Sequence, residues 1–171
     1  MDVLILGHGS IGEATARRLE PLGATVRGVA LHAREGVHTI DELPRLLPDA
    51  DAVVVLVPLT DGTRHMVDAD FIAQMKPNAL LVNAGRGPTM DMAAVTEAVL
   101  DGRIRAALDV TDPEPLPEGH PLWSAPGLLL TPHVAGAMTT GMRPVMAYVR
   151  DQLARYAAGE PLLNVVGPQG Y

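Results

Sequence analysis

One stretch near the start of the chain decides its fold: Val3-Leu4-Ile5-Leu6-Gly7-His8-Gly9-Ser10-Ile11-Gly12. Its first four residues form an apolar run of strand length, and a segment with helical periodicity begins beside its last glycine. The glycines fit the pattern G-x-G-x-x-G. In that pattern the first glycine permits a tight turn, the second lets the backbone approach a pyrophosphate, and the third allows close packing of helix on strand. The stretch therefore predicts a strand, a turn and a helix whose first amide groups bind a dinucleotide.

Strand-length apolar runs continue to alternate with helix-period segments along the chain. We expect strands at Val3 to Leu6, Thr25 to Ala30, Ala52 to Val57, Ala79 to Val82, Ala106 to Val110, and Leu128 to Leu130. We expect helices at Ile11 to Glu20, Ile40 to Leu47, Ala69 to Met75, Met92 to Leu100, and Thr139 to Ala158. Runs that are apolar throughout suit strands covered on both faces. The order predicts an α/β fold of Rossmann type, a doubly wound parallel sheet with helices on both faces.

Side chains at several boundaries support these expectations. Thr39 and Glu42 are spaced for a capping box at the start of a helix. Asp91 can cap the helix that Gly102 ends. The proline-rich segment from Asp112 to Pro126 cannot form a regular element, and a connection of that length predicts an ordered loop with a function.

The length and apolar content indicate one globular domain. Of the 171 residues, 47% are hydrophobic and 19% are charged, which suits a covered core. We expect residues 1–171 to form one dinucleotide-binding domain, with its core at about 1–137 and a C-terminal helix and tail at about 138–171. The last expected helix has an apolar face, for which the sheet of this domain, another domain and a second subunit are alternative partners. Its residues are Met142, Val145, Met146, Val149, Leu153 and Tyr156.

Charge and composition exclude several classes of function. Thirteen basic and 20 acidic residues give a net charge of −7, which disfavours a general nucleic-acid binder. The absence of cysteine excludes disulfides and thiolate metal sites, and it suits a reducing cytoplasm, where we expect the protein. The longest apolar run, Ala52 to Leu59, is well short of the roughly 20 residues that span a bilayer. We therefore predict no membrane segment. The histidines outside the later motifs do not have the spacing of a metal site, so we also predict no metal.

The end of the second expected strand bears on the choice of cofactor. An acidic residue about 20 positions after the glycine turn usually binds the ribose of NAD. Here the strand end carries no carboxylate, and Glu35 comes only later, in the loop. Arg34, together with His32, can instead bind the 2′-phosphate of NADP, while an ordinary surface arginine is the alternative. The sequence therefore favours NADP(H) over NAD(H).

Three later segments carry residues suited to catalysis: Asn83-Ala84-Gly85-Arg86-Gly87, Asp109-Val110-Thr111-Asp112-Pro113-Glu114-Pro115, and Thr131-Pro132-His133-Val134-Ala135-Gly136. They place an arginine, a carboxylate and a histidine near strand ends, where sheets of this kind bind ligands. A guanidinium can pair with a carboxylate at two points, and histidine as a residue type exchanges protons near neutral pH. These groups suit hydride transfer involving a 2-hydroxy or 2-oxo acid.

Together with Val57-Pro58-Leu59-Thr60, Pro121-Leu122-Trp123 and the ending Gly159 to Val166, these segments resemble the cofactor-binding domain of the D-isomer-specific 2-hydroxyacid dehydrogenase family. The resemblance covers nearly the whole chain in order. It implies that Arg86 grips the substrate carboxylate, that His133 is the general acid/base, and that Glu114 orients His133. It further implies that Asp109 contacts the nicotinamide carboxamide, although a strand-end aspartate also serves as a loop cap. The expected cofactor-binding residues are Gly7, Gly9, Ser10, Ile11, Gly12, His32, Arg34, Val57, Pro58, Thr63, Ala84, Gly85, Arg86, Asp109, His133 and Gly136.

The sequence departs from the family pattern at its start. Family members carry most of a substrate domain before the glycine turn, and this sequence begins on the expected first strand. We therefore expect the substrate domain to be absent and turnover to be weak or missing, because closure of that domain excludes water from the site. The alternatives are a dehydrogenase completed by a partner subunit, a dinucleotide-binding module without turnover, and an association module. Since the family dimerises mainly through this domain, we expect a homodimer.

Overall fold

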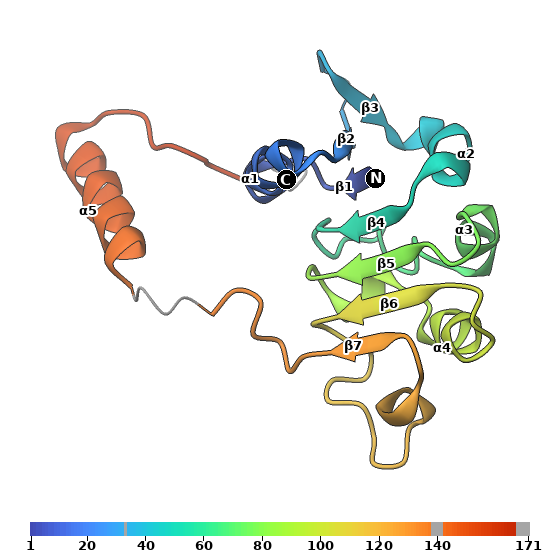
Figure 1. Cartoon of the computed structure of the whole chain (residues 1–171). Helices are drawn as coiled ribbons and strands as arrows, with labels where there is room; N and C mark the ends of the chain where they lie inside the picture. Colours follow the sequence, from blue (N-terminus) through green and yellow to red (C-terminus); the bar gives the residue numbers. More distant parts are fainter. Residues whose placement is uncertain (33, 138–141, 167–171) are drawn as a thin grey trace. The chain divides into compact units, whose positions relative to one another are not determined.

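The computed structural model describes residues 1–32, 34–137 and 142–166, in two compact units, Met1–Ala135 and Gly136–Tyr171. The first unit is built on a parallel seven-stranded sheet in the order β3-β2-β1-β4-β5-β6-β7 (Figure 1). This arrangement confirms the expected fold class. The strands are β1 (Asp2–Leu6), β2 (Thr25–Ala30), β3 (Val37–Thr39), β4 (Ala52–Val55), β5 (Leu80–Asn83), β6 (Arg105–Leu108) and β7 (Leu128–Leu130).

The strand order reverses beside β1. The chain runs from β1 outward through β2 to β3, returns to β4 on the other side of β1, and then continues outward to β7. Leu6 at the end of β1 pairs with Val55 at the end of β4. In sheets of this kind, connections leave in opposite directions at such a point and open a crevice at the carboxyl ends of the strands. The glycine turn that follows β1 lies at this crevice.

Strand β1 contributes to two separate hydrophobic clusters. Leu4 and Leu6 belong to the larger cluster, which contains buried residues of α2, α3 and α4. Val3 and Ile5 belong to the smaller one, which contains Ala16 of α1. Since side chains alternate between the faces of a strand, the run Val3 to Leu6 is apolar throughout because both of its faces are covered.

Helices lie on both faces of the sheet. Figure 1 shows α2, α3 and α4 along one side of the sheet and α1 on the other. Asp91 accepts hydrogen bonds from the amides of Ala93 and Ala94, as the capping prediction required. The α-helices are α1 (Ser10–Leu19), α2 (Leu43–Leu46), α3 (Ala69–Gln74), α4 (Met92–Leu100) and α5 (Arg143–Ala158). The 3-10 helices are η1 (Glu20–Leu22), η2 (Ile40–Glu42), η3 (Leu47–Asp49), η4 (Gly87–Thr89) and η5 (Pro121–Ser124).

Some element boundaries were wrong. The expected helix over Ile40 to Leu47 is divided into η2, α2 and η3, with a proline in the first turn of both α2 and η3. The capping box of Thr39 and Glu42 is present, but it begins the 3-10 helix η2. Strand β3 was not expected, and the last helix begins at Arg143, whereas positions 139–141 of its expected start lie outside the described residues.

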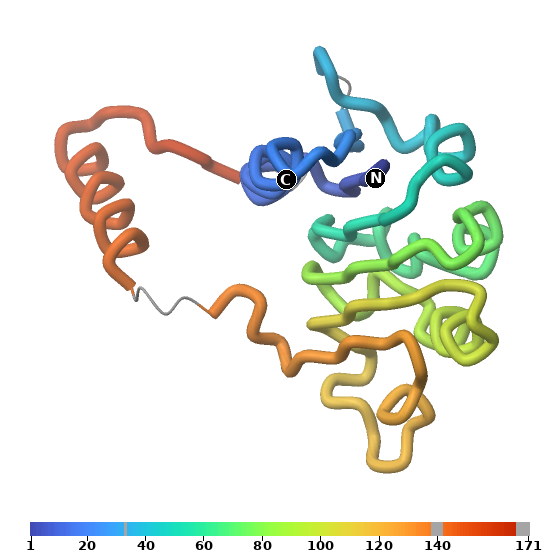
Figure 2. The backbone as a smooth tube through the Cα atoms, in the orientation of Figure 1, coloured from blue at the N-terminus to red at the C-terminus, as the bar shows by residue number. Residues whose placement is uncertain are grey.

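The long proline-rich connection between β6 and β7 is ordered but not wholly irregular. It contains η5, a four-residue 3-10 helix that begins at Pro121. The indole Nε1 of Trp123 donates to the carbonyl oxygen of Pro117 at 2.9 Å, which fastens the loop to this helix. Figure 2 shows residues 109–127 as a long excursion before the chain enters β7. The connection carries Glu114.

The second unit consists of α5 and a tail that folds back along it. The hydroxyl of Tyr148 donates to the carbonyl oxygen of Leu163 at 3.0 Å, and the amide of Leu163 donates to Gln152 at 2.9 Å. Gly159 ends the helix with φ of 68°, a left-handed conformation that glycine adopts without strain. The predicted apolar face of α5 is exposed, at Met142, Val145, Met146, Val149, Leu153 and Tyr156.

Candidate active site

The glycine turn is shaped by backbone contacts. Gly7 has φ of +95°, and a Cβ there would come within 2.8 Å of the backbone of Val57. At Gly12 a Cβ would be 2.6 Å from the carbonyl oxygen of Gly7, so α1 packs tightly on the turn. Glycine is therefore required at both positions by the fold itself.

Gly9 differs from its neighbours, because a Cβ there would meet nothing within 4 Å. It lies at the start of α1, where the first helical hydrogen bond runs from the amide of Glu13 to the carbonyl oxygen of Gly9 at 2.8 Å. The amide groups of Ser10, Ile11 and Gly12 therefore precede the first helical bond and point out of the helix end. Free amides beside an open glycine fit the pyrophosphate of a dinucleotide.

The turn after β4 is held by Thr63. Its hydroxyl donates to the carbonyl oxygen of Pro58 at 2.6 Å and accepts from the amide of Thr60 at 2.8 Å. Val57 is buried at the start of this turn. The expected cofactor-binding residues Val57, Pro58 and Thr63 thus form one ordered turn after the strand next to β1.

Arg86 is presented by a loop that a buried asparagine shapes. Asn83, which is 0% exposed, accepts from the amide of Gly85 at 2.8 Å and donates to the carbonyl oxygen of Arg86 at 3.2 Å. The side-chain amide of Asn83 also donates to the hydroxyl oxygen of Thr89 at 3.1 Å, and the Thr89 hydroxyl donates to the carbonyl oxygen of Arg86 at 2.6 Å. The exposed side chain of Arg86 bonds back to the carbonyl oxygen of Gly85 at 2.7 Å. Exposed Ala84 lies in the same loop. The backbone of Arg86 is fixed while its guanidinium stays accessible.

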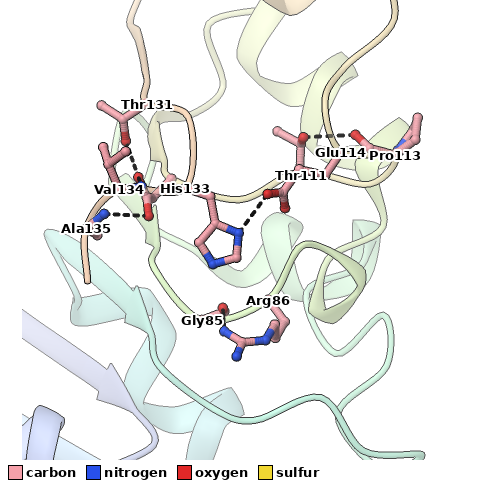
Figure 3. Close-up of polar contacts among 10 residues, drawn as sticks. Gly85, Arg86, Thr111, Pro113, Glu114, Thr131, His133, Val134 and Ala135 are labelled. Carbon is pink, nitrogen blue, oxygen red and sulfur yellow. Dashed lines mark hydrogen bonds and ion pairs between the residues drawn. The ribbon is translucent and has the colours of Figure 1, made fainter. Parts of the chain in front are cut away.

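His133 and Glu114 meet although 19 positions separate them in the sequence. The Nδ1 atom of His133 lies 2.7 Å from Oε1 of Glu114, and their side chains are 48% and 41% exposed. Because a carboxylate accepts hydrogen bonds, this contact places the ring proton on Nδ1 and leaves Nε2 for proton exchange. Figure 3 shows the ring of His133 with Glu114 on one side and the guanidinium of Arg86 on the other. The structure thus brings two of the sequence-predicted catalytic residues, His133 and Glu114, into direct contact.

Asp109 holds the loop that carries His133. Its carboxylate accepts from the hydroxyl of Thr131 at 2.5 Å and from the amides of Val134 at 2.9 Å and Ala135 at 2.8 Å. Its own carbonyl oxygen accepts from the amide of His133, whose φ of +55° is left-handed. These contacts overdetermine an unusual backbone conformation. The loop-cap alternative for Asp109 therefore has direct support, and its expected contact with the carboxamide stays a prediction.

Burial and hydrogen bonding act in opposite directions on Asp109, which is 7% exposed. Burial raises the pKa of its carboxyl, but hydrogen bonds from Thr131, Ala135 and Val134, together with nearby His133, lower the pKa below its ordinary value overall. The ionised form is therefore favoured in the folded protein. Asp109 contributes stability while it is ionised and loses this contribution as the pH falls through its folded pKa.

Asp109→Asn is expected to lower the free energy of unfolding by about 2–3 kcal/mol at pH 7, because an amide group would face one of the present donors. Urea denaturation measures this loss. The difference from wild type should persist down to about pH 4 and shrink below it, as the wild-type carboxyl also becomes neutral. Asp61→Asn, in an exposed turn, is the matched control. A loss at pH 7 no larger than that of the control would contradict this role.

Arg34 contacts two residues at the glycine turn and the start of α1. Its guanidinium donates to the carbonyl oxygen of His8 and lies 3.4 Å from the carboxylate of Glu13. His32 is exposed just after β2, and Gly136 is exposed at the start of the second unit.

Sequence reasoning missed His8 and Glu13 beside the cofactor turn, as it missed Asn83, Thr89 and Thr131. A polar residue ending an apolar run, as Asn83 does, was the available signal.

Within residues 1–32, 34–137 and 142–166, no group of three or more His, Cys, Asp or Glu side chains is arranged to hold a metal ion. No helix in that part is long and apolar enough to cross a membrane.

Comparison with known proteins identifies a family that this chain matches. Residues 1–135 match the family described as D-isomer specific 2-hydroxyacid dehydrogenase, NAD binding domain. Glycerate dehydrogenase of Methylorubrum extorquens is 36% identical over 165 residues, which cover 95% of this chain and 51% of that protein. The chain spans about half the length of the curated relatives it matches.

Two crystal structures show the same fold with cofactor bound. A D-isomer specific 2-hydroxyacid dehydrogenase of Xanthobacter autotrophicus, in complex with NADPH and MES, is 38% identical with a TM-score of 0.90, covering 99% of this chain and 72% of that one. An NADPH-dependent glyoxylate/hydroxypyruvate reductase of Sinorhizobium meliloti, in complex with NADP and sulfate, is 33% identical with a TM-score of 0.89, covering 99% of this chain and 56% of that one.

Proposed function

The chain belongs to the D-isomer specific 2-hydroxyacid dehydrogenase family through its NAD-binding domain, and from this membership we propose that it serves hydride exchange between a nicotinamide cofactor and a small 2-hydroxy or 2-oxo acid. We further propose that NADP(H) is favoured over NAD(H). Arg34 near the end of β2 supports this preference, as do the NADPH and NADP bound to the two crystal structures described above. A cytoplasmic location stays a prediction from the sequence.

One observation carries the proposal. The contact of His133 with Glu114, at 2.7 Å, leaves Nε2 of His133 for proton exchange, and Figure 3 shows the accessible guanidinium of Arg86 on the other side of the ring. Arginine binds a carboxylate with two parallel hydrogen bonds, and a histidine with one fixed proton can exchange another. A 2-oxo acid has a carboxylate that Arg86 can bind and an adjacent carbonyl oxygen that can take a proton from His133.

The residues then divide the chemistry of reduction between them. A nicotinamide cofactor, when bound at the glycine turn, would supply the hydride for the carbonyl carbon of the substrate. Nε2 of His133 donates the proton that the carbonyl oxygen takes up, so that the product is the hydroxyl of a 2-hydroxy acid. Glu114 accepts the hydrogen bond from Nδ1 and so fixes the orientation of the ring before this transfer. Arg86 binds the substrate carboxylate, and in the oxidation direction His133 accepts the hydroxyl proton.

We propose that turnover by these 171 residues alone is weak. The side chains of His133 and Glu114 are each close to half exposed, so water reaches the reacting groups. Exclusion of water strengthens electrostatic stabilisation of the transition state. An association module, as a homodimer, is the second candidate, and the exposed apolar face of α5 favours it.

Turnover separates a dehydrogenase from a binding module. Glyoxylate, hydroxypyruvate and phenylpyruvate are added in turn to the chain with NADPH, and oxidation is followed by absorbance with the protein in excess over cofactor. Slow oxidation that depends on the oxo acid is expected. No oxidation above that of cofactor alone would contradict the proposed reaction, and intact binding of NADPH would then support a dinucleotide-binding module without turnover.

Light scattering that shows only monomer across micromolar concentrations would contradict association.

Gly9→Val is expected to weaken binding of both cofactors by at least about tenfold, because the side chain enters the space assigned to the pyrophosphate. The fold should tolerate the change, since the backbone at Gly9 is extended and a Cβ meets no atom within 4 Å. Cofactor fluorescence measures affinity, and thermal unfolding measures stability. Undiminished binding by a folded variant would place the dinucleotide elsewhere.

A further inference from the structure

Three polar side chains from different elements meet beside the glycine turn. Arg34 comes from the loop after β2, Glu13 from the first turn of α1, and His8 from the turn itself. Nη2 of Arg34 donates to the carbonyl oxygen of His8 and lies 3.4 Å from Oε1 of Glu13. It also lies 3.5 Å from Nδ1 of His8. The guanidinium is thus held at the turn by these contacts, although the side chain of Arg34 is 47% exposed.

The fold provides the place for His8. A Cβ at Gly28 of β2 would lie 2.3 Å from carbon atoms of the His8 imidazole, so the ring packs directly on the strand backbone. Only glycine leaves room for this contact. His8 therefore fills the space between the glycine turn and β2, and its backbone carbonyl provides one of the acceptors that hold Arg34.

We propose that Glu13 is a specificity-determining residue, which weakens the preference for NADP(H) by competing with the 2′-phosphate for Arg34. This inference rests on the proposed dinucleotide site. A phosphate monoester carries close to two negative charges at neutral pH and pairs well with a guanidinium. To bind it, Arg34 has to leave or share its contact with Glu13, while the carboxylate of Glu13 repels the phosphate. NAD(H) has a hydroxyl at this position, so it neither competes with Glu13 for Arg34 nor is repelled by the carboxylate of Glu13.

The exposure of the pair limits the size of this effect. The side chains of Arg34 and Glu13 are 47% and 46% exposed, so water screens their attraction. Exposed ion pairs contribute little, and loss of the competing carboxylate corresponds to about a two- to fivefold change in affinity. The change should be larger at low ionic strength than at high, because salt screens exposed charges.

The sequence offers a matched control for net charge. Glu20 is the exposed residue that directly follows the far end of α1, so Glu20→Gln removes the same charge at a position away from Arg34. Glu13→Gln keeps the size of the side chain and removes only its charge. Arg34→Gln removes the group for which carboxylate and phosphate compete.

The test is a titration of NADPH and NADH, separately and at low salt, into wild type, the three single variants and the double variant of Glu13 and Arg34. Glu13→Gln should tighten binding of NADPH by about two- to fivefold and leave the affinity for NADH unchanged. The Glu20→Gln control should bind both cofactors with the affinity of wild type. Arg34→Gln should weaken binding of NADPH by about tenfold, and in the double variant Glu13→Gln should increase the affinity for NADPH less than it does alone. NADPH affinity that is unchanged or weaker in Glu13→Gln overturns the inference, as does equal tightening of NADH. If wild type binds neither cofactor, the proposed function fails and the inference fails with it, whereas binding indifferent to Glu13 contradicts the inference alone.

Discussion

Replacing His133 by asparagine is expected to slow oxo-acid-dependent oxidation of NADPH by about 10²- to 10⁴-fold, while cofactor affinity stays nearly the same. Asparagine has no ring nitrogen that can donate a proton to the substrate and take it back. Asparagine tolerates the left-handed backbone at this position, where φ is +55°, so the loop should keep its shape. Single-turnover absorbance, with protein in excess, measures the rate.

His65→Asn is the matched control for this variant. His65 is exposed and has φ of +52°, so the same side-chain change is made on the same kind of backbone. Its rate should stay within about twofold of wild type, because exposed substitutions away from special features have small effects. A rate for His133→Asn equal to that of the control would contradict the assignment of His133 as acid/base.

Gly87→Ala is expected to destabilise the first unit by about 2–4 kcal/mol, which corresponds to a fall in Tm of roughly 4–16 °C. A Cβ at Gly87 would lie 1.8 Å from the carbonyl oxygen of Thr111 and 3.0 Å from the amide nitrogen of Asp112. Both atoms are backbone, so no side chain can move aside. The loop of Arg86 and the loop of Glu114 have to separate, and turnover should fall together with stability.

Gly62→Ala tests whether alanine itself causes such a loss. A Cβ at Gly62 would come no closer than 4.0 Å to its nearest neighbour, the hydroxyl oxygen of Thr60. Its Tm should stay close to that of wild type. An equally small change for Gly87→Ala would contradict the close contact between the two loops.

The glycine turn and the catalytic trio could be predicted because their signals are local. Gly7 to Gly12 follow a strand and begin a helix within a few residues, and each glycine has a steric reason that the structure confirms at Gly7 and Gly12. The run Val3 to Leu6 is apolar throughout, which indicated a strand covered on both faces. The trio was found from motif positions, and the contact of His133 with Glu114 fits that expectation.

Contacts between distant segments could not be predicted in the same way. The partners of Asp109 lie 22 to 26 positions away, and nothing in its own strand indicates that its carboxylate holds the loop of His133. Strand β3, Val37–Thr39, has no apolar run, and it is a strand because it pairs with β2 at the sheet edge. The neighbours of Arg34 depend on how the tip of β2 meets α1, which spacing along the sequence does not contain.

The most direct test of the central claim is a fluorescence titration of the full chain with NADPH and NADH. We expect saturable binding of the reduced cofactor, tighter for NADPH than for NADH, and lost in the folded Gly9→Val variant. No binding of either cofactor at millimolar concentration would contradict the claim that this chain is a dinucleotide-binding domain.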